Sequence, residues 1–358
     1  MSDKPLVLVV HGMGRHSAES VKRSVIEACN YSLASYPSWR TKTAKKKIED
    51  YVEIVGIGYD HIFEKERASI ASNADALKSL LATLGSFPAE IINTLSKTDE
   101  DNFLTTHLLD VIFYAATHHE IVRLYIAKEI TKHLQAAGTR KVHIVGHSLS
   151  TIVLNDTLGK LFGGGILDTD GTRYRLTGLL NQIQSLWMFA NASEAMFKLN
   201  PTKTTINPLE SLAKPSMNRS TATCKYYNVM HALDPMRLDG FEPRIGDNWI
   251  PNETYLRAYK YIQTEHLIET PNPHDLFGYI IDPAVRYRFL WEIMPADAIS
   301  ISKQERDQVE NEVVDLVDQL RELSESFSSI SSASNFSDWI QNLSQFGKTL
   351  EAMSGKTL

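Results

Sequence analysis

The chain has 358 residues, of which 43% are hydrophobic and 22% charged, and this composition argues against collagen-like, coiled-coil and wholly disordered chains. Its 37 basic and 43 acidic residues give a formal net charge of −6, which lacks the basic excess of a dedicated nucleic-acid-binding protein. The two cysteines, Cys29 and Cys224, are too few and too isolated for a disulfide scaffold or a zinc ribbon.

The N-terminal residues 1–11 show no pattern of a cleaved secretory signal. Their apolar run is short, follows an acidic residue and leads to no small-residue cleavage site. Nowhere does an apolar run approach the roughly 20 residues that span a bilayer. We therefore expect a cytoplasmic protein; peripheral membrane contact and export by a route without a cleaved signal stay open.

Short apolar runs rich in β-branched residues alternate with helical stretches. The runs cover residues 6–10, 51–55, 142–145, 185–190, 225–230 and 258–262. Near-continuous apolar runs are typical of strands that are buried on both faces of a parallel sheet. The alternation with helices predicts βαβ units, hence one α/β domain over about 1–295 with six core strands.

Residues 60–105 depart from this alternation. Apolar side chains recur there at helical spacing, between the second strand and the helix that precedes the third. A helical insertion on the carboxyl side of a strand could be a lid over a site or a packed pair of surface helices. The sequence leaves both interpretations open.

The C-terminal residues 296–358 form a second predicted region, a helical extension. Apolar residues from Val309 to Leu323 step by 4, 3, 4 and 3, which resembles a coiled-coil seam but covers only about two heptads. A second apolar stripe runs from Trp339 to Leu350, after a serine-rich stretch. We expect these helices to cover the main domain; homodimerisation or membrane-surface contact is the alternative.

The strongest local motif is GHSLS at residues 146–150. It follows a β-branched run and precedes an apolar helical pattern, which is the context that a nucleophile elbow requires. Ser148 is the candidate nucleophile. Gly146 provides the small residue two positions before it, whereas Ser150 replaces the usual second glycine, and we expect this small residue to be tolerated with closer crowding.

Two backbone N–H groups are candidate donors to an oxyanion. The Leu149 N–H begins the helix after Ser148, where the helix dipole also favours negative charge. The HGMG loop at residues 11–14 directly follows the first strand, and α/β-hydrolases take their second donor from such a loop. We expect that donor to be the Met13 N–H, with Gly14 as the second choice.

A serine nucleophile needs a histidine base and an acid that orients it. Asp234 follows the fifth predicted strand, and His274 follows the sixth, in the chain order that α/β-hydrolases use. The sequence therefore predicts a Ser148–Asp234–His274 triad that needs no metal and no cofactor.

Several residues compete for these roles. His266 also follows the sixth strand, but its apolar surroundings favour packing. Asp239 and Asp247 lie further along the loop after Asp234, and Glu194 is the acid that follows the fourth strand. Near the motifs, we assign His147 a structural role and expect His11 to brace its loop by hydrogen bonding.

With these residues assembled, the chain resembles the DDHD-domain lipases, which are intracellular phospholipases A1 of the α/β-hydrolase type. The resemblance rests on five segments: 110–114 (DVIFY), 146–150 (GHSLS), 153–158 (VLNDTL), 231–238 (HALDPMRL) and 274–277 (HDLF). The last segment departs from the family's H-x-D-Y-W ending: Asp275 directly follows His274, and the aromatic residues differ.

This resemblance implies a serine ester hydrolase that acts on a glycerophospholipid or a related acyl-ester lipid. A soluble carboxylesterase or thioesterase with the same triad is one alternative, and a hydrolase-fold binding module with an inactive site is another. The lipid hydrolase and the soluble esterase or thioesterase would both use Ser148 to attack an acyl carbonyl.

Overall fold

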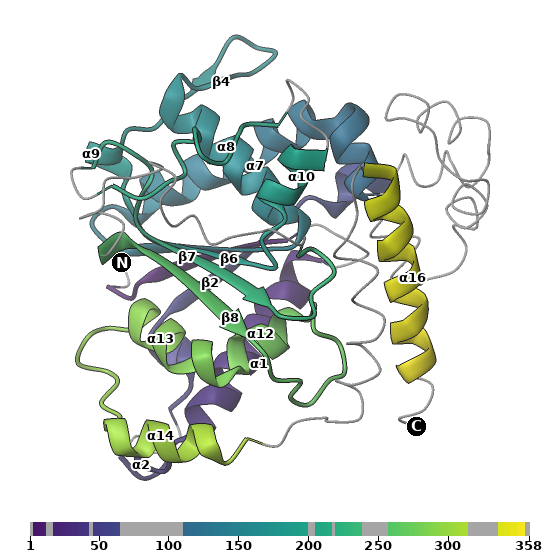
Figure 1. Cartoon of the computed structure of the whole chain (residues 1–358). Coiled ribbons are helices and arrows are strands. Elements are labelled where there is room, and N and C mark those ends of the chain that lie inside the picture. The colour runs from purple at the N-terminus through teal and green to yellow at the C-terminus, as the bar shows by residue number, and fades with distance from the viewer. Residues whose placement is uncertain are drawn as a thin grey trace.

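The computed structural model describes residues 3–11, 17–42, 46–64, 110–199, 205–216, 219–237, 257–313 and 336–354. Six strands form one sheet in the order β2-β1-β3-β6-β7-β8, and every neighbouring pair is parallel (Figure 1). The strands are β1 (Leu6–His11), β2 (Glu53–Gly58), β3 (Val142–His147), β6 (Ile183–Phe189), β7 (Thr223–His231) and β8 (Tyr259–Thr264). All six predicted strands are thus present, and the α/β prediction is confirmed.

The sequence placed the second strand too early and missed a small ribbon. Tyr51 and Val52 both donate backbone hydrogen bonds to the Ile48 carbonyl, at 3.0 Å each, so they belong to a turn. The strand begins only at Glu53, whose N–H reaches the Pro5 carbonyl at 2.9 Å. The missed ribbon pairs β4 (Ile166–Leu167) with β5 (Arg173–Tyr174) in antiparallel fashion, and two-residue strands are too short to show a period.

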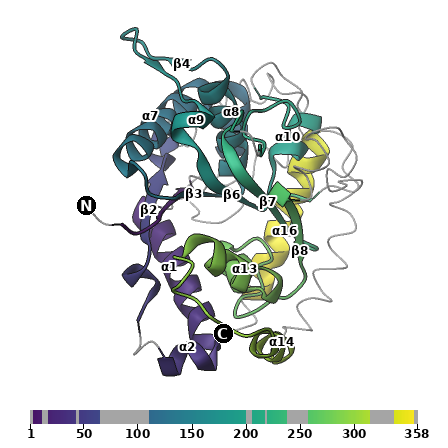
Figure 2. The ribbon, with the colours of Figure 1, turned by 90° about the vertical axis from the view of Figure 1, so that its left-hand side faces the viewer.

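Helices cover both faces of the sheet. They are α1 (Ala18–Ser35), α2 (Pro37–Lys42), α7 (His119–Ala137), α8 (Leu149–Gly163), α9 (Gly178–Asn181), α10 (Ser193–Leu199), α12 (Leu276–Ile281), α13 (Pro283–Ile293), α14 (Lys303–Asn311) and α16 (Phe336–Ser354), with a 3₁₀ turn at Ile48–Asp50 and a π-helical turn at Tyr114–His118. Figure 2 shows α7 and α8 on one side of the sheet, and α1 and α13 on the other.

Two hydrophobic clusters follow from the alternation of side chains along the strands. In β1, Leu6, Leu8 and Val10 belong to the cluster beneath α7 and α8, whereas Val7 and Val9 belong to the cluster with α1, α12 and α13. Because both faces are buried, the strand is apolar throughout, which is why it could be recognised in the sequence.

The parallel strands bring three histidines to one edge of the sheet. His11, His147 and His231 are the last residues of β1, β3 and β7, and all three are buried. The carboxyl ends of parallel strands share an edge, where ligand sites of open α/β sheets occur. The loops that follow these strands therefore converge on one place.

The C-terminal region packs onto the rest of the chain where it is described. Val309 of α14 is buried in the cluster with α1 and α13, and Trp339 and Ile340 of α16 are buried in the other cluster. The predicted seam continues over residues 314–323, which lie outside the described residues. Among the described helices, none is both long and apolar enough to cross a membrane.

Candidate active site

Ser148 occupies a strained turn between β3 and α8. Its φ of 59° and ψ of −129° place a non-glycine residue at positive φ, which costs on the order of 1–3 kcal/mol. Hydrogen bonds on both sides hold this conformation: the Ser148 N–H donates to the Phe189 carbonyl at 3.0 Å, and the Ser148 carbonyl accepts from the Thr151 hydroxyl at 2.6 Å. The strand–turn–helix geometry expected around the candidate nucleophile is present.

The neighbours of this turn explain the GHSLS motif. A Cβ at Gly146 would lie 2.6 Å from Leu154 Cδ1 of α8, so glycine lets the helix approach the strand. Ser150 is fully buried; its hydroxyl donates to the His147 carbonyl at 2.8 Å and accepts from the His147 N–H at 2.7 Å. The serine at the second small position thus fits, and it adds two hydrogen bonds that a glycine could not make.

Three side chains from three separate loops form one hydrogen-bonded row. His274, in the loop between β8 and α12, places its Nε2 2.8 Å from Ser148 Oγ and its Nδ1 2.8 Å from Asp234 Oδ2. All three residues are buried, with exposed fractions of 3%, 1% and 0% for His274, Ser148 and Asp234. The structure therefore brings together the three residues that the sequence predicted as a triad.

Asp234 is held in its ionised form. Burial alone would raise the pKa of Asp234, but His274, Tyr279 and the Met236 N–H outweigh it and bring the pKa below the ordinary value of 3.8. A carboxylate only accepts hydrogen bonds, so His274 carries its proton on Nδ1 and presents an unprotonated Nε2 to Ser148. This is the tautomer that a general base requires.

The other candidates for the histidine base and for the acid make contacts away from Ser148 where the structure describes them. The His266 N–H lies 3.4 Å from Asp282 Oδ2, at the start of α13, and His274 rather than His266 contacts Ser148. Glu194 lies in the first turn of α10, and Asp275 caps α12 by accepting from the Phe277 N–H at 3.2 Å. Asp239 and Asp247 lie outside the described residues.

Of the two predicted oxyanion donors, one is described. Leu149 is the first residue of α8 and is buried directly beside Ser148. An N–H in the first turn of a helix has no acceptor within that helix, so it can serve a bound oxygen. Met13 and Gly14 lie outside the described residues, as does most of the predicted lid, beyond residue 64.

His147 and His11 link the loops around the row. The His147 ring stacks on the His11 ring with centroids 5.6 Å apart, and it lies 4.9 Å from the His274 ring. His147 Nε2 also reaches the His274 backbone carbonyl at 2.7 Å. His147 thus steadies the backbone that carries His274, whereas the described contact of the His11 ring is stacking, and the hydrogen bond predicted for His11 stays a prediction.

Tyr279 is a member of the site that sequence reasoning missed. Its hydroxyl donates to Asp234 Oδ2 at 2.7 Å and accepts the His231 N–H at 2.8 Å. The residue lies in the apolar helix α12, where a tyrosine is readily taken for a core residue. No motif marked it, because the contact depends on how α12 packs against β7.

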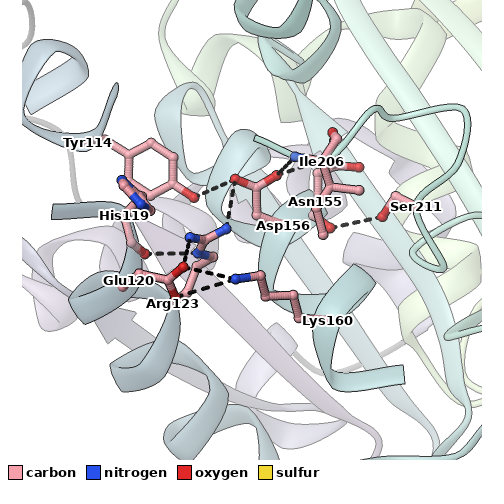
Figure 3. A network of polar contacts seen from close by, with 9 residues as sticks. All are labelled: Tyr114, His119, Glu120, Arg123, Asn155, Asp156, Lys160, Ile206 and Ser211. Carbon is pink, nitrogen blue, oxygen red and sulfur yellow. Dashed lines mark hydrogen bonds and ion pairs between the residues drawn. The ribbon is translucent and has the colours of Figure 1, made fainter. Parts of the chain in front are cut away.

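A second buried polar network lies between α7 and α8 (Figure 3). The Tyr114 hydroxyl donates to Asp156 Oδ2 at 2.8 Å, and the Ile206 N–H donates to Asp156 Oδ1 at 2.8 Å. Arg123 Nη1 lies 4.0 Å from Asp156 Oδ2. Tyr114 and Asp156 belong to two segments that carry the resemblance to DDHD-domain lipases, 110–114 and 153–158. The network joins these segments, and none of its hydrogen bonds or ion pairs among the described residues reaches Ser148.

No protein-family model, no curated protein and no solved structure matches this chain. Within the part of the chain that the structure describes, no group of three or more His, Cys, Asp or Glu side chains could hold a metal ion.

Proposed function

We propose that this chain is a serine ester hydrolase of the α/β-hydrolase type that acts on an acyl lipid. The observation that carries the proposal is the row Ser148 Oγ–His274 Nε2 and His274 Nδ1–Asp234 Oδ2, with 2.8 Å at both steps. The positive φ of Ser148 and the position of Leu149 at the start of α8 add support, because both belong to a nucleophile elbow.

The first half of the reaction acylates the serine. Ser148 Oγ attacks the acyl carbonyl carbon while His274 Nε2 accepts the hydroxyl proton, and Asp234 stabilises the imidazolium. The Leu149 N–H donates to the developing oxyanion, and such a donor contributes about 3 kcal/mol. The tetrahedral adduct then collapses, and His274 returns its proton to the leaving alcohol oxygen.

The second half regenerates the enzyme. A water molecule attacks the acyl-serine while His274 Nε2 takes its proton, so that a hydroxyl is added to the acyl carbon. His274 then protonates Ser148 Oγ as the ester bond breaks. The products are a carboxylic acid and an alcohol, and all protons are returned.

The lipid part of the proposal rests on the resemblance to DDHD-domain lipases, which segments such as 146–150 and 231–238 carry. A soluble carboxylesterase or thioesterase would use the same three residues on shorter acyl groups.

The test combines a fluorophosphonate probe, which labels activated serines, with turnover of p-nitrophenyl esters and phospholipid liposomes. Ser148→Ala should abolish labelling and lower kcat by about six orders of magnitude, as in a measured triad. His274→Ala should also lose labelling, because Ser148 loses its base, whereas the matched control His266→Ala should retain it. Activity of Ser148→Ala within tenfold of the wild type would reject the proposal. A preference for short soluble esters over liposomes would favour the esterase.

A further inference from the structure

The Tyr279 hydroxyl has both of its hydrogen-bonding roles occupied. It lies 2.7 Å from Asp234 Oδ2 and 2.8 Å from the His231 backbone nitrogen. The ring is 2% exposed, and it packs among the rings of Phe189, His147 and His231, with centroids 5.8, 6.3 and 6.4 Å away. The hydroxyl is therefore fixed in position at the back of the candidate triad.

The direction of these two bonds follows from the chemistry of the partners. A backbone N–H can only donate, so the Tyr279 oxygen is the acceptor toward His231. The phenolic proton must then go elsewhere, and Asp234 Oδ2 at 2.7 Å is a far better acceptor than the Met230 sulfur at 4.0 Å. Tyr279 thus donates to the carboxylate.

The same carboxylate oxygen also faces His274. Oδ2 accepts from both Tyr279 and His274 Nδ1, at 2.7 and 2.8 Å, while Oδ1 accepts the Met236 N–H at 2.7 Å. The three donors leave the carboxylate one orientation that satisfies all of them. Two donors on one oxygen also divide its negative charge between them.

We propose that Tyr279 is a positioning residue for the candidate triad: its hydroxyl fixes the Asp234 carboxylate against His274 and limits how strongly that carboxylate attracts the imidazole proton. The proposal rests on the proposed hydrolase function. It extends that function by adding a fourth side chain, which acts through Asp234 and touches no substrate.

Other titratable or charged groups surround the pair. His147 of β3 contacts the His274 carbonyl and ring, and His11 of β1 stacks on His147. Next to Asp234, burial is the largest influence on His231 and lowers its pKa to about 4. Arg237 donates a hydrogen bond to the Ala232 carbonyl at 3.1 Å. Tyr279→Phe keeps the ring that packs against His147 and His231, so a difference between the variants reports on the Tyr279 hydroxyl and its two hydrogen bonds.

Tyr279→Phe removes the hydroxyl and keeps the ring. We expect kcat to fall about tenfold with KM within about twofold, because the carboxylate loses its fixed orientation but the substrate loses no contact. With its full charge directed at His274, Asp234 should favour the imidazolium more strongly. The acid limb of the kcat/KM profile should therefore move to higher pH, by about half a unit to one unit.

Tyr114→Phe is the matched control, because Tyr114 makes the same bond, at 2.8 Å, to the other buried aspartate, Asp156. Its kcat should stay within about twofold of the wild-type value, and the acid limb of its kcat/KM profile should lie at the same pH as in the wild type. A Tyr279→Phe enzyme with an unchanged acid limb, or equal changes in the two variants, would overturn the proposal.

A second variant covers the case in which Tyr279→Phe does not fold. Replacing Tyr279 with 3-fluorotyrosine keeps the hydroxyl and makes it a stronger donor, so the acid limb should move to lower pH. An unchanged or opposite movement contradicts the proposal.

A proton NMR readout separates this inference from the hydrolase function. The far-downfield resonance of the His274 Nδ1–H reports on its bond to Asp234, and it should shift further downfield in Tyr279→Phe and not in Tyr114→Phe. Absence of any esterase activity in the wild-type protein would refute the hydrolase proposal. An unchanged His274 Nδ1–H resonance in Tyr279→Phe would refute the role of Tyr279.

Discussion

Two buried aspartates in this protein have nearly the same hydrogen-bond partners, but their pKa values are shifted in opposite directions. Asp234 and Asp156 each accept a tyrosine hydroxyl on Oδ2, at 2.7 and 2.8 Å, and a backbone N–H on Oδ1, at 2.7 and 2.8 Å. Both side chains are 0% exposed. Yet the pKa of Asp234 is lowered, whereas burial raises the pKa of Asp156 to about 6.

The difference lies in the third partner. His274 bonds to Asp234 directly at 2.8 Å, whereas Arg123 lies 4.0 Å from Asp156 and directs its Nη2 at Glu120, 2.6 Å away (Figure 3). The charge of the guanidinium is thus divided between two carboxylates. A partner offsets the burial of a carboxylate more fully when it bonds to the carboxylate directly and is not shared with a second one. The first arrangement suits catalysis; the second joins two helices.

The sharpest test of this contrast compares the two amides. Asp234→Asn should lower kcat of the proposed hydrolase about 10⁴-fold, because an amide no longer selects the His274 tautomer that leaves Nε2 unprotonated. Asp156→Asn should leave kcat within about threefold, since none of the described hydrogen bonds of Asp156 reaches Ser148. Steady-state kinetics on a p-nitrophenyl ester measures both. Comparable losses in the two variants would mean that the two sites are not functionally distinct.

The next largest effect concerns stability. Arg123 is 1% exposed, and among the described residues it is the cation that pairs with Asp156, so Arg123→Met removes the described counter-charge of a buried carboxylate. We expect the free energy of unfolding to fall by about 3 kcal/mol at neutral pH, as measured by denaturant titration.

Lys160→Met is the control for Arg123→Met. Lys160 also binds Glu120, at 3.0 Å, but it stands at the partly exposed edge of the network, where an ion pair contributes at most about 1 kcal/mol. Equal losses in Arg123→Met and Lys160→Met would show that Asp156 does not depend on Arg123.

The sequence predicted the sheet and the triad because both rest on strong local signals. Strands buried on two faces are apolar throughout, and each triad residue follows such a strand. Parallel strands then bring their carboxyl ends together, so Ser148, Asp234 and His274 could be predicted to meet. The length of each strand was less predictable, because turn hydrogen bonds such as those to the Ile48 carbonyl decide where β2 begins.

The polar partners of the two aspartates could not be predicted in the same way. Tyr279 reaches Asp234 only because α12 packs against the end of β7, and Arg123 reaches Asp156 only because α7 packs beside α8. In the sequence, Tyr279 lies within an apolar helix and Arg123 within an ordinary amphipathic one. Such contacts depend on helix packing angles, which residue spacing does not determine.

The smallest expected effect is a pH dependence that belongs to Asp156 alone. Burial, as the largest influence, raises its pKa from 3.8 to about 6, so folding favours the protonated carboxyl. Its contribution to stability is complete below the unfolded value and is lost as the pH rises through about 6. Asp156→Asn has no such proton to lose. The unfolding free energy of the variant minus that of the wild type should therefore increase by about 1 kcal/mol from about pH 5 to about pH 7.5.

Asp168→Asn serves as the control for this pH dependence. A hydrogen bond from Lys128 lowers the pKa of Asp168, so Asp168 is ionised at both pH values in the folded and the unfolded chain. Its difference from the wild type should stay constant across that interval. If the Asp156→Asn difference is equally constant, then the partners of Asp156 offset its burial as fully as the partners of Asp234 do, and the contrast between the two carboxylates disappears.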